Sequence, residues 1–232
     1  MSASNKKLII FIHTCAKYEE SRAKILEQTW ASGRDNVIFI TDNEHSTLKN
    51  HIYLGPYNKG FTYHPITVLK MFELFLYRYS DYDYYMMIDD DSYLYIDKLI
   101  SFLSFFDKDE PYMIGDFLNW VSVRFANSYG GNYNLWVSGG PGIVFTKSCI
   151  IEYIKLFGNF SVECTSHDVW FYELFKISDG RIRRVHCPGF HQYGAEYLYK
   201  KYTNSDNNLI SIHLDHDMSL VTKYHNNVEI AM

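Results

Sequence analysis

Residues 84–91 read Tyr-Tyr-Met-Met-Ile-Asp-Asp-Asp, an apolar run that ends in three acidic residues. The run has the length and composition of a buried β-strand. Three adjacent carboxylates repel one another unless a cation or solvent takes up the charge. In extended backbone Asp89 and Asp91 point to one side and Asp90 to the other, and paired oxygens on one side suit Mg²⁺ or Mn²⁺. The stretch therefore predicts a strand that ends at a metal site, with a solvated turn that caps the next helix as the alternative.

Strands and helices alternate on both sides of this stretch. We expect strands at Lys7–His13, Val37–Thr41, Tyr84–Ile88, Tyr112–Gly115, Val121–Phe125, Ile143–Thr146, Ile182–His186 and Leu209–His213. We expect helices at Arg22–Trp30, His64–Ser80, Lys98–Phe106, Ser148–Phe157 and Val169–Lys176, with Ser21 and Asp97 as N-caps of the first and third. The first half reads as βαβαβ with a parallel sheet and the second half as mixed. The pattern predicts an α/β fold with a Rossmann-like mixed sheet flanked by helices.

Composition limits the class of protein. The chain has 232 residues, 47% hydrophobic and 21% charged, which fits one globular domain. Its net charge of −5 argues against a protein that holds nucleic acid mainly by charge. No segment approaches the roughly 20 apolar residues that cross a bilayer. The four scattered cysteines, Cys15, Cys149, Cys164 and Cys187, suit a reducing compartment.

Polar residues follow three of the expected strands: Thr14, Asp42 and the acidic triplet. Open sheets of this kind bind ligands at the carboxyl ends of their strands. Neither a GxGxxG fingerprint nor a Walker loop occurs, which argues against a dehydrogenase or a P-loop ATPase.

Three further features have both a functional and a structural interpretation. The glycines of Ser138–Gly142 permit close approach of the backbone to a ligand, or else form a bend between strands. Asp168 stands where a helix begins, as a general base for an attacking hydroxyl or simply as an N-cap. His213 ends a strand-like run, where it completes a metal site or serves as a structural side chain.

Four blocks, taken in order, resemble family 31 of the inverting glycosyltransferases, which includes Fringe-type N-acetylglucosaminyltransferases and core 1 β1,3-galactosyltransferases. The blocks are Arg22–Trp30, Asp81–Tyr93, Ser138–Gly142 and His167–Val169, within a resemblance that spans about residues 8–215. It implies a GT-A fold and a UDP-sugar donor with Mn²⁺ or Mg²⁺. It also implies transfer of galactose, N-acetylglucosamine or glucose, with inversion, to a glycan or glycoprotein acceptor, commonly in a β1,3 linkage.

The resemblance also implies roles for single residues. Asp91 would ligate the metal, Asp89 would assist near the ribose or through water, and His213 would be the distant ligand, with His191 as the alternative. Asp168 would be the general base. Thr14 and Asp42 fall where uracil is held, and Gly139 and Gly140 would lie against the donor sugar. The full donor site expected is Thr14, Arg22, Asp42, Lys70, Asp89, Asp90, Gly139 and Gly140.

The expected organisation is one GT-A catalytic domain, 1–232, with a nucleotide-binding half at 1–91 and an acceptor and metal-completing half at 92–232. Family members usually carry a membrane anchor and work in the Golgi, whereas this chain starts almost at its first strand. We therefore expect a cytoplasmic bacterial or viral relative, or a Golgi-lumen enzyme if the chain is a trimmed piece. A homodimer is a candidate oligomeric state.

Two other functions are alternatives. One is a non-catalytic relative that binds glycans or proteins, as a chaperone does; the intact acidic triplet and Asp168 argue against it. The other is a metal-dependent phosphohydrolase, which would need a second cluster of acidic and histidine ligands.

Overall fold

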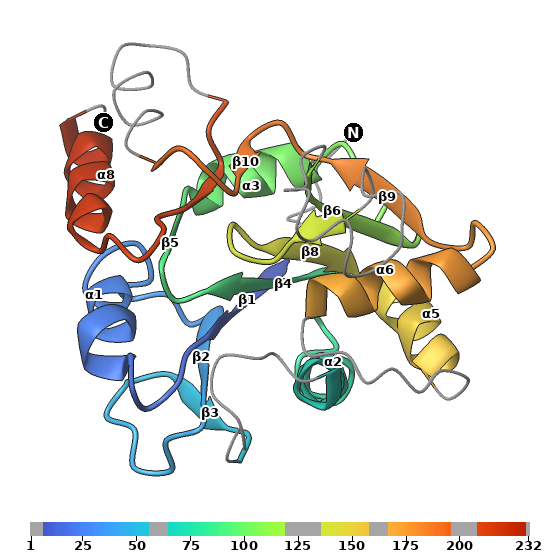
Figure 1. Cartoon of the computed structure of the whole chain (residues 1–232), viewed down its shortest axis with the longest axis horizontal. Helices are drawn as coiled ribbons and strands as arrows, with labels where there is room; N and C mark the ends of the chain where they lie inside the picture. Colours follow the sequence, from blue (N-terminus) through green and yellow to red (C-terminus); the bar gives the residue numbers. More distant parts are fainter. Residues whose placement is uncertain (1–6, 56–64, 119–135, 158–166, 196–207, 231–232) are drawn as a thin grey trace, which may run out of the picture.

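The computed structural model describes residues 7–55, 65–118, 136–157, 167–195 and 208–230, and Figure 1 shows how they are arranged. The strands are β1 Leu8–His13, β2 Val37–Thr41, β3 His51–Tyr53, β4 Tyr84–Asp89, β5 Ser92–Leu94, β6 Tyr112–Leu118, β7 Trp136–Ser138, β8 Ile143–Thr146, β9 Arg183–His186, β10 Phe190–His191 and β11 Ser211–His213. The helices are the π-helical turn η1 Glu19–Ala23, α1 Lys24–Glu27, α2 Pro65–Arg78, α3 Ile96–Leu103, α5 Lys147–Phe157, α6 His167–Ile177 and α8 Ser219–Ile230.

The main sheet has the strand order β3-β2-β1-β4-β8-β6-β7, with β9 also paired to β6. Strands β3, β2, β1 and β4 run parallel to one another, whereas β8 is antiparallel to both β4 and β6. The predicted parallel first half and mixed second half are therefore confirmed. A second, three-stranded sheet has the order β10-β11-β5 and joins the C-terminal part of the chain to the segment that follows β4.

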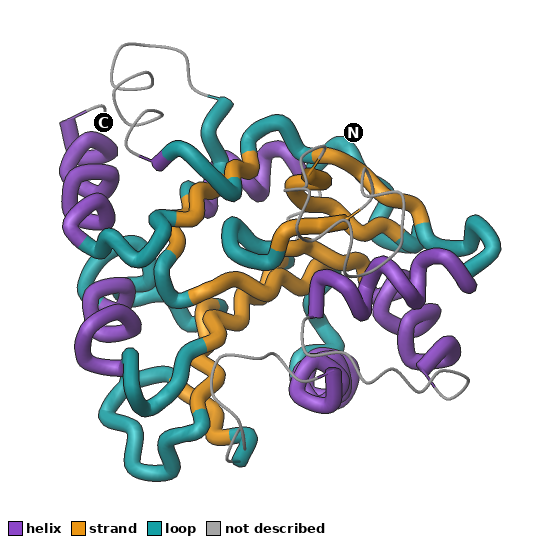
Figure 2. Tube along the Cα trace, viewed as in Figure 1, coloured by secondary structure: helices purple, strands orange, loops and turns teal. Residues whose placement is uncertain are grey.

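Both faces of the main sheet are covered, which explains why strand β1 is apolar from Leu8 to Ile12, before its last residue His13. Leu8, Ile10 and Ile12 pack into the core on one face, with side chains of α1, α3 and α8. Ile9 and Phe11 pack into the core on the other face, with side chains of α2, α5 and α6. Since successive side chains of a strand alternate between faces, a strand with two covered faces has no polar positions. Figures 1 and 2 show α2, α5 and α6 together on one side of the sheet.

At three helix starts the residue considered as an N-cap does not cap the helix. The helix expected at Arg22–Trp30 is η1 followed by α1, which ends at Glu27, and Ser21 lies inside η1 rather than at an N-cap. The backbone N–H of Ala23 reaches back five residues to Tyr18 O, which inserts an extra residue into the turn. Helix α3 begins at Ile96, so Asp97 is in its first turn and is not the cap. Helix α6 begins at His167, which places Asp168 inside the helix and excludes the N-cap interpretation.

Three further expectations concern a strand, membrane-spanning helices and the cysteines. The strand predicted at Val121–Phe125 lies outside the described residues. No helix in the described part of the chain is long and apolar enough to cross a bilayer. Cys15, Cys149 and Cys187 are free thiols, and Cys164 lies outside the described residues.

Candidate functional site: an acidic cluster at the carboxyl ends of the strands

The carboxyl ends of β1, β2 and β4 bring the predicted polar residues to one edge of the sheet. The parallel register pairs His13 of β1 with Asp89 of β4, so the residues that follow both strands are neighbours. Thr14 is buried, and its hydroxyl donates a 2.7 Å hydrogen bond to Asp90 Oδ2. Asp42, after β2, accepts a 2.7 Å hydrogen bond from the backbone N–H of Ala16. Side chains from three strand ends therefore line one edge.

Asp89, Asp91 and His213 form a cluster in which one potential ligand atom from each lies within 4.8 Å of the others. Strand β11 runs antiparallel to β5 and pairs His213 with Ser92, the residue after Asp91. His213 Nε2 lies 3.1 Å from Asp91 Oδ1. Two carboxylates and an imidazole are a donor set that Mn²⁺ accepts, so the residues present fit a divalent cation.

Electrostatics keep Asp91 ionised. Burial alone would raise the pKa of its carboxyl, but hydrogen bonds from His213 and His216 and the charge of Arg22 hold that pKa at about 2. Burial would lower the pKa of His213, and its hydrogen bond to Asp91 outweighs burial and raises the pKa to about 9. Asp91 therefore carries the negative charge that a metal ligand needs.

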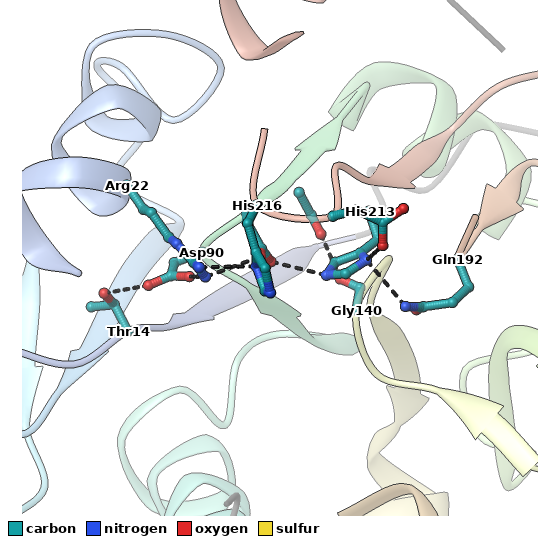
Figure 3. A network of polar contacts seen from close by, with 10 residues as sticks. Thr14, Arg22, Asp90, Gly140, Gln192, His213 and His216 are labelled. Atoms are coloured by element: carbon teal, nitrogen blue, oxygen red, sulfur yellow. Dashed lines mark hydrogen bonds and ion pairs between the residues drawn. The ribbon is translucent and has the colours of Figure 1, made fainter. Parts of the chain in front are cut away.

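Arg22 contacts the second and third residues of the acidic triplet, Asp90 and Asp91. Figure 3 shows its side chain reaching toward Asp90 and His216. Its guanidinium nitrogen NH1 is 3.1 Å from Asp90 Oδ1 and 3.0 Å from Asp91 Oδ2. Burial raises the pKa of Asp90 to about 7, against the opposing effects of the Thr14 hydrogen bond and the Arg22 charge. Arg22 thus takes up part of the charge that the sequence analysis assigned to a cation or solvent. Its other nitrogen, Nη2, lies 2.9 Å from His216 Nδ1, and the guanidinium stacks over the Tyr18 ring at 4.0 Å from the ring centroid.

The adjacent glycines Gly139 and Gly140 contact two different parts of the site. A Cβ atom at Gly139 would lie 1.9 Å from His167 Nε2 and 2.9 Å from Asp168 Oδ1. A Cβ atom at Gly140 would lie 2.8 Å from the ring of His213. Because consecutive Cα atoms are about 3.8 Å apart, the loop places Asp168 and the acidic cluster on either side of one short backbone segment. Only glycine permits both approaches, which is why the predicted Gly-Gly pair occurs here.

Asp168 lies in the first turn of α6, where the helix dipole stabilises negative charge. Its Oδ1 is 2.7 Å from Nε2 of the buried His167, and its side chain keeps 28% of its surface exposed. Burial lowers the pKa of His167, but the charge of Asp168, the contact between them and the charge of Asp89 raise it overall.

Two predicted residues take other places. Lys70 donates a 3.2 Å hydrogen bond to the carbonyl of Leu54, beyond strand β3, and its described contacts do not include the carboxylates. His191 pairs with Ile212 in the small sheet, and the acidic cluster contains His213 rather than His191.

Sequence reasoning missed three residues of the site. His216 contacts Asp91 Oδ2, Gln192 Nε2 lies 3.1 Å from His213 Nδ1, and Asp215 Oδ1 lies 3.2 Å from the same nitrogen. The only local signal is the pattern Ile-His-Leu-Asp-His at 212–216, three charged or titratable residues within four positions.

Comparisons with known proteins concern the family and the fold of the chain. A family model described as Fringe-like matches residues 3–192. The chain is 27% identical over 201 residues to a human protein named β-1,3-glucosyltransferase, and 23% identical over 202 residues to the mouse protein of that name. Each alignment covers 83% of this chain and 38% of the relative, so the chain spans well under half the length of these relatives.

A solved structure described as a glycosyltransferase involved in glycosylation of the major capsid of PBCV-1 has a similar fold. It matches with a TM-score of 0.55 at 9% identity, covering 95% of this chain and 99% of the other. At this identity the likeness concerns the fold alone.

Proposed function

Because the chain belongs to the Fringe-like family and has the GT-A fold of glycosyltransferases, we propose that it is a metal-dependent glycosyltransferase. It transfers a sugar from a UDP-sugar to a hydroxyl of a glycan or glycoprotein and inverts the anomeric centre. The observation that carries the proposal is the placement of Asp168 and the Asp89–Asp91–His213 cluster on either side of the Gly139–Gly140 backbone.

The acidic cluster is the donor-diphosphate end of this site. A divalent cation held by Asp89, Asp91 and His213 would stabilise the negative charge that develops on the departing UDP. Thr14 and Arg22 hold Asp90 by hydrogen bonds, and Arg22 also holds Asp91, so the strand end keeps its shape in the absence of a donor. Preorganised charge of this kind costs no rearrangement during the reaction.

Asp168 is the general base of the proposed reaction. The acceptor oxygen attacks the anomeric carbon and gives its proton to Asp168, while the bond from that carbon to the UDP oxygen breaks and UDP leaves with the electron pair. His167 Nε2 lies 2.7 Å from Asp168 Oδ1, and the charge of a protonated His167 would orient the carboxylate. One base and no protein nucleophile give a single displacement, and therefore inversion.

The names of the relatives order the donors to be tested. Both curated relatives are named β-1,3-glucosyltransferases, which supports UDP-glucose as the first candidate and a β1,3 linkage as the first product to look for. UDP-galactose and UDP-N-acetylglucosamine follow, because these sugars differ by one hydroxyl configuration or an acetamido group that only a few contacts distinguish.

Titration calorimetry tests the proposal directly. UDP and the three UDP-sugars are titrated with and without Mn²⁺ into the wild type, Asp91→Ala and, as a matched control, Asp97→Ala, whose carboxylate is exposed on α3. We expect binding that requires both Mn²⁺ and Asp91 and that is unchanged in Asp97→Ala. Absence of binding to the wild type under every condition would overturn the proposal.

A further inference from the structure

His213 has polar neighbours on both ring nitrogens. Nε2 faces Asp91 Oδ1 at 3.1 Å. Nδ1 faces Asp215 Oδ1 at 3.2 Å and Gln192 Nε2 at 3.1 Å. Figure 3 shows His213 between Gln192 and His216. The nitrogen that faces the acidic cluster and the nitrogen that faces away from it therefore have different partners.

If His213 binds a cation, the position of its ring proton determines what each neighbouring group must donate or accept. A neutral imidazole binds a metal through the nitrogen that carries no proton, and its proton then resides on the other nitrogen. Binding through Nε2 requires a proton on Nδ1 and an acceptor for that proton. Gln192 turns its amide nitrogen Nε2, a donor, toward Nδ1, because its Oε1 accepts a hydrogen bond from the Ser138 hydroxyl. Gln192 in this rotation is therefore not the acceptor that Nδ1 needs. An ionised carboxylate only accepts, so Asp215 is the neighbour that selects the required tautomer.

The backbone at Asp215 is unusual for a residue with a side chain. Asp215 has φ 48° and the next residue, His216, has φ 72°, so two consecutive non-glycine residues are left-handed. The turn is closed by hydrogen bonds from Leu214 N to Asp91 O and from Asp217 N to Leu214 O, both 2.9 Å. This turn directs Asp215 to His213 and His216 to Asp91. Strained conformations of this kind persist where the surrounding structure holds them, and they cluster at functional sites.

Packing does not account for the identity of Asp215. Its side chain is 57% exposed, so no apolar core holds it against His213. A glycine at this position would satisfy the left-handed backbone with less strain. The carboxylate is therefore present for its contact with Nδ1 rather than for the turn.

We propose that Asp215 is a positioning residue of the metal site: its carboxylate accepts the Nδ1 proton of His213 and leaves Nε2 free to bind a divalent cation. The inference rests on the proposed function, because it assumes that the cluster of Asp89, Asp91 and His213 binds a cation. It adds a residue that acts through His213 and does not itself touch the substrate.

The test measures Mn²⁺ binding to the whole chain by electron paramagnetic resonance, in the absence of any donor. Asp215→Gly removes the carboxylate and relieves the backbone, and we expect it to weaken Mn²⁺ binding by about 10- to 100-fold without lowering the melting temperature. Asp215→Asn keeps an oxygen that can accept, so its affinity should fall between those of Asp215→Gly and the wild type. Asp217→Asn is the matched control, because Asp217 bonds only to Ser219 among its described side-chain contacts.

A second readout reports the tautomer itself. In ¹⁵N-labelled protein with Mg²⁺, which is diamagnetic, the wild-type His213 ring should show a protonated Nδ1, and Asp215→Gly should lose that signature. A structural role for Asp215 predicts the opposite pattern: a lower melting temperature with the His213 signals unchanged.

The possible results distinguish a failure of the positioning role of Asp215 from a failure of the proposed function. If the wild type binds Mn²⁺ and Asp215→Gly binds it equally well, the positioning role is overturned and the proposed function stands. If the wild type does not bind Mn²⁺, the metal dependence of the proposed function fails and the positioning role fails with it.

Discussion

Alanine at Gly139 and alanine at Gly140 should damage different halves of the proposed reaction, although the two residues are adjacent. In Gly139→Ala the new methyl carbon would lie 1.9 Å from His167 Nε2 and 2.9 Å from Asp168 Oδ1. In Gly140→Ala it would lie 2.6 Å from Gln192 Oε1 and 2.8 Å from the His213 ring. The first substitution therefore displaces the proposed base, and the second displaces the proposed metal ligand.

The distances give the size of each effect. An ordinary contact between such atoms is about 3.5 Å, so His167 must move by about 1.6 Å in Gly139→Ala. His167 is 5% exposed and covalently joined to Asp168, so Asp168 moves with it. A misplacement of about 1 Å can cost about 100-fold in rate, or about 2.7 kcal/mol of transition-state stabilisation. In Gly140→Ala the ring of His213 must move by about 0.7 Å, and disturbance of a metal ligand costs about 10- to 100-fold in metal affinity.

Two assays on the same preparations separate these effects. Mn²⁺ binding, followed by electron paramagnetic resonance, should be near the wild-type value in Gly139→Ala and weakened in Gly140→Ala. Turnover at saturating Mn²⁺ and donor, followed by release of UDP, should fall at least 100-fold in Gly139→Ala. The reasoning is refuted if Gly139→Ala keeps wild-type turnover, or if both variants lose Mn²⁺ binding to the same extent.

Three other substitutions have expected outcomes. Asp168→Asn should reduce transfer by about 10²- to 10⁴-fold and keep Mn²⁺-dependent UDP binding in calorimetry; full activity would remove Asp168 as the base. Thr14→Val removes the hydroxyl that donates to the buried Asp90 and should cost about 1–3 kcal/mol in urea unfolding, with Thr47→Val as an exposed control; an equal cost in both would contradict the reasoning. Phe72→Ala empties a fully buried position between Tyr85 and Phe145 and should cost about 3–5 kcal/mol, which thermal unfolding would reveal; a loss below about 1 kcal/mol would mean that the core there relaxes.

Long apolar runs made the main sheet predictable. Strands β2 and β8 have the predicted bounds, and β1 and β4 differ from prediction by one residue at one end. Their runs are apolar up to the last residue because both faces are covered, and each strand ends in one polar residue: His13, Thr41, Asp89 or Thr146. Strands β3, β5, β7 and β10 were not predicted, because two or three residues are too few to show a period. The predicted bounds of the first helix were wrong, because no spacing of apolar residues indicates the π-helical turn closed by the hydrogen bond from Ala23 N–H to Tyr18 O.

Some residues of the candidate site could also be located from the sequence, whereas the contacts between them could not. Asp89, Asp90 and Asp91 could be located from the sequence, because an acidic triplet directly after a buried strand is a local pattern. Arg22 was expected near the donor, yet its bonds to Asp90 and Asp91 join residues 68 and 69 positions apart and follow only from the fold.

By itself, the sequence determined the alternation of strands and helices, the polar ends of the strands and the glycine pair, because each depends on residues close together in the chain. Only the tertiary structure decided that His213 rather than His191 joins the carboxylates, and that Asp215, His216 and Gln192 surround it. The contact of His216 with Asp91 spans 125 positions. This contact depends on the pairing of β11 with β5 and on the left-handed turn at Asp215 and His216. Tertiary packing stabilises both features, and the sequence near His216 does not indicate either of them.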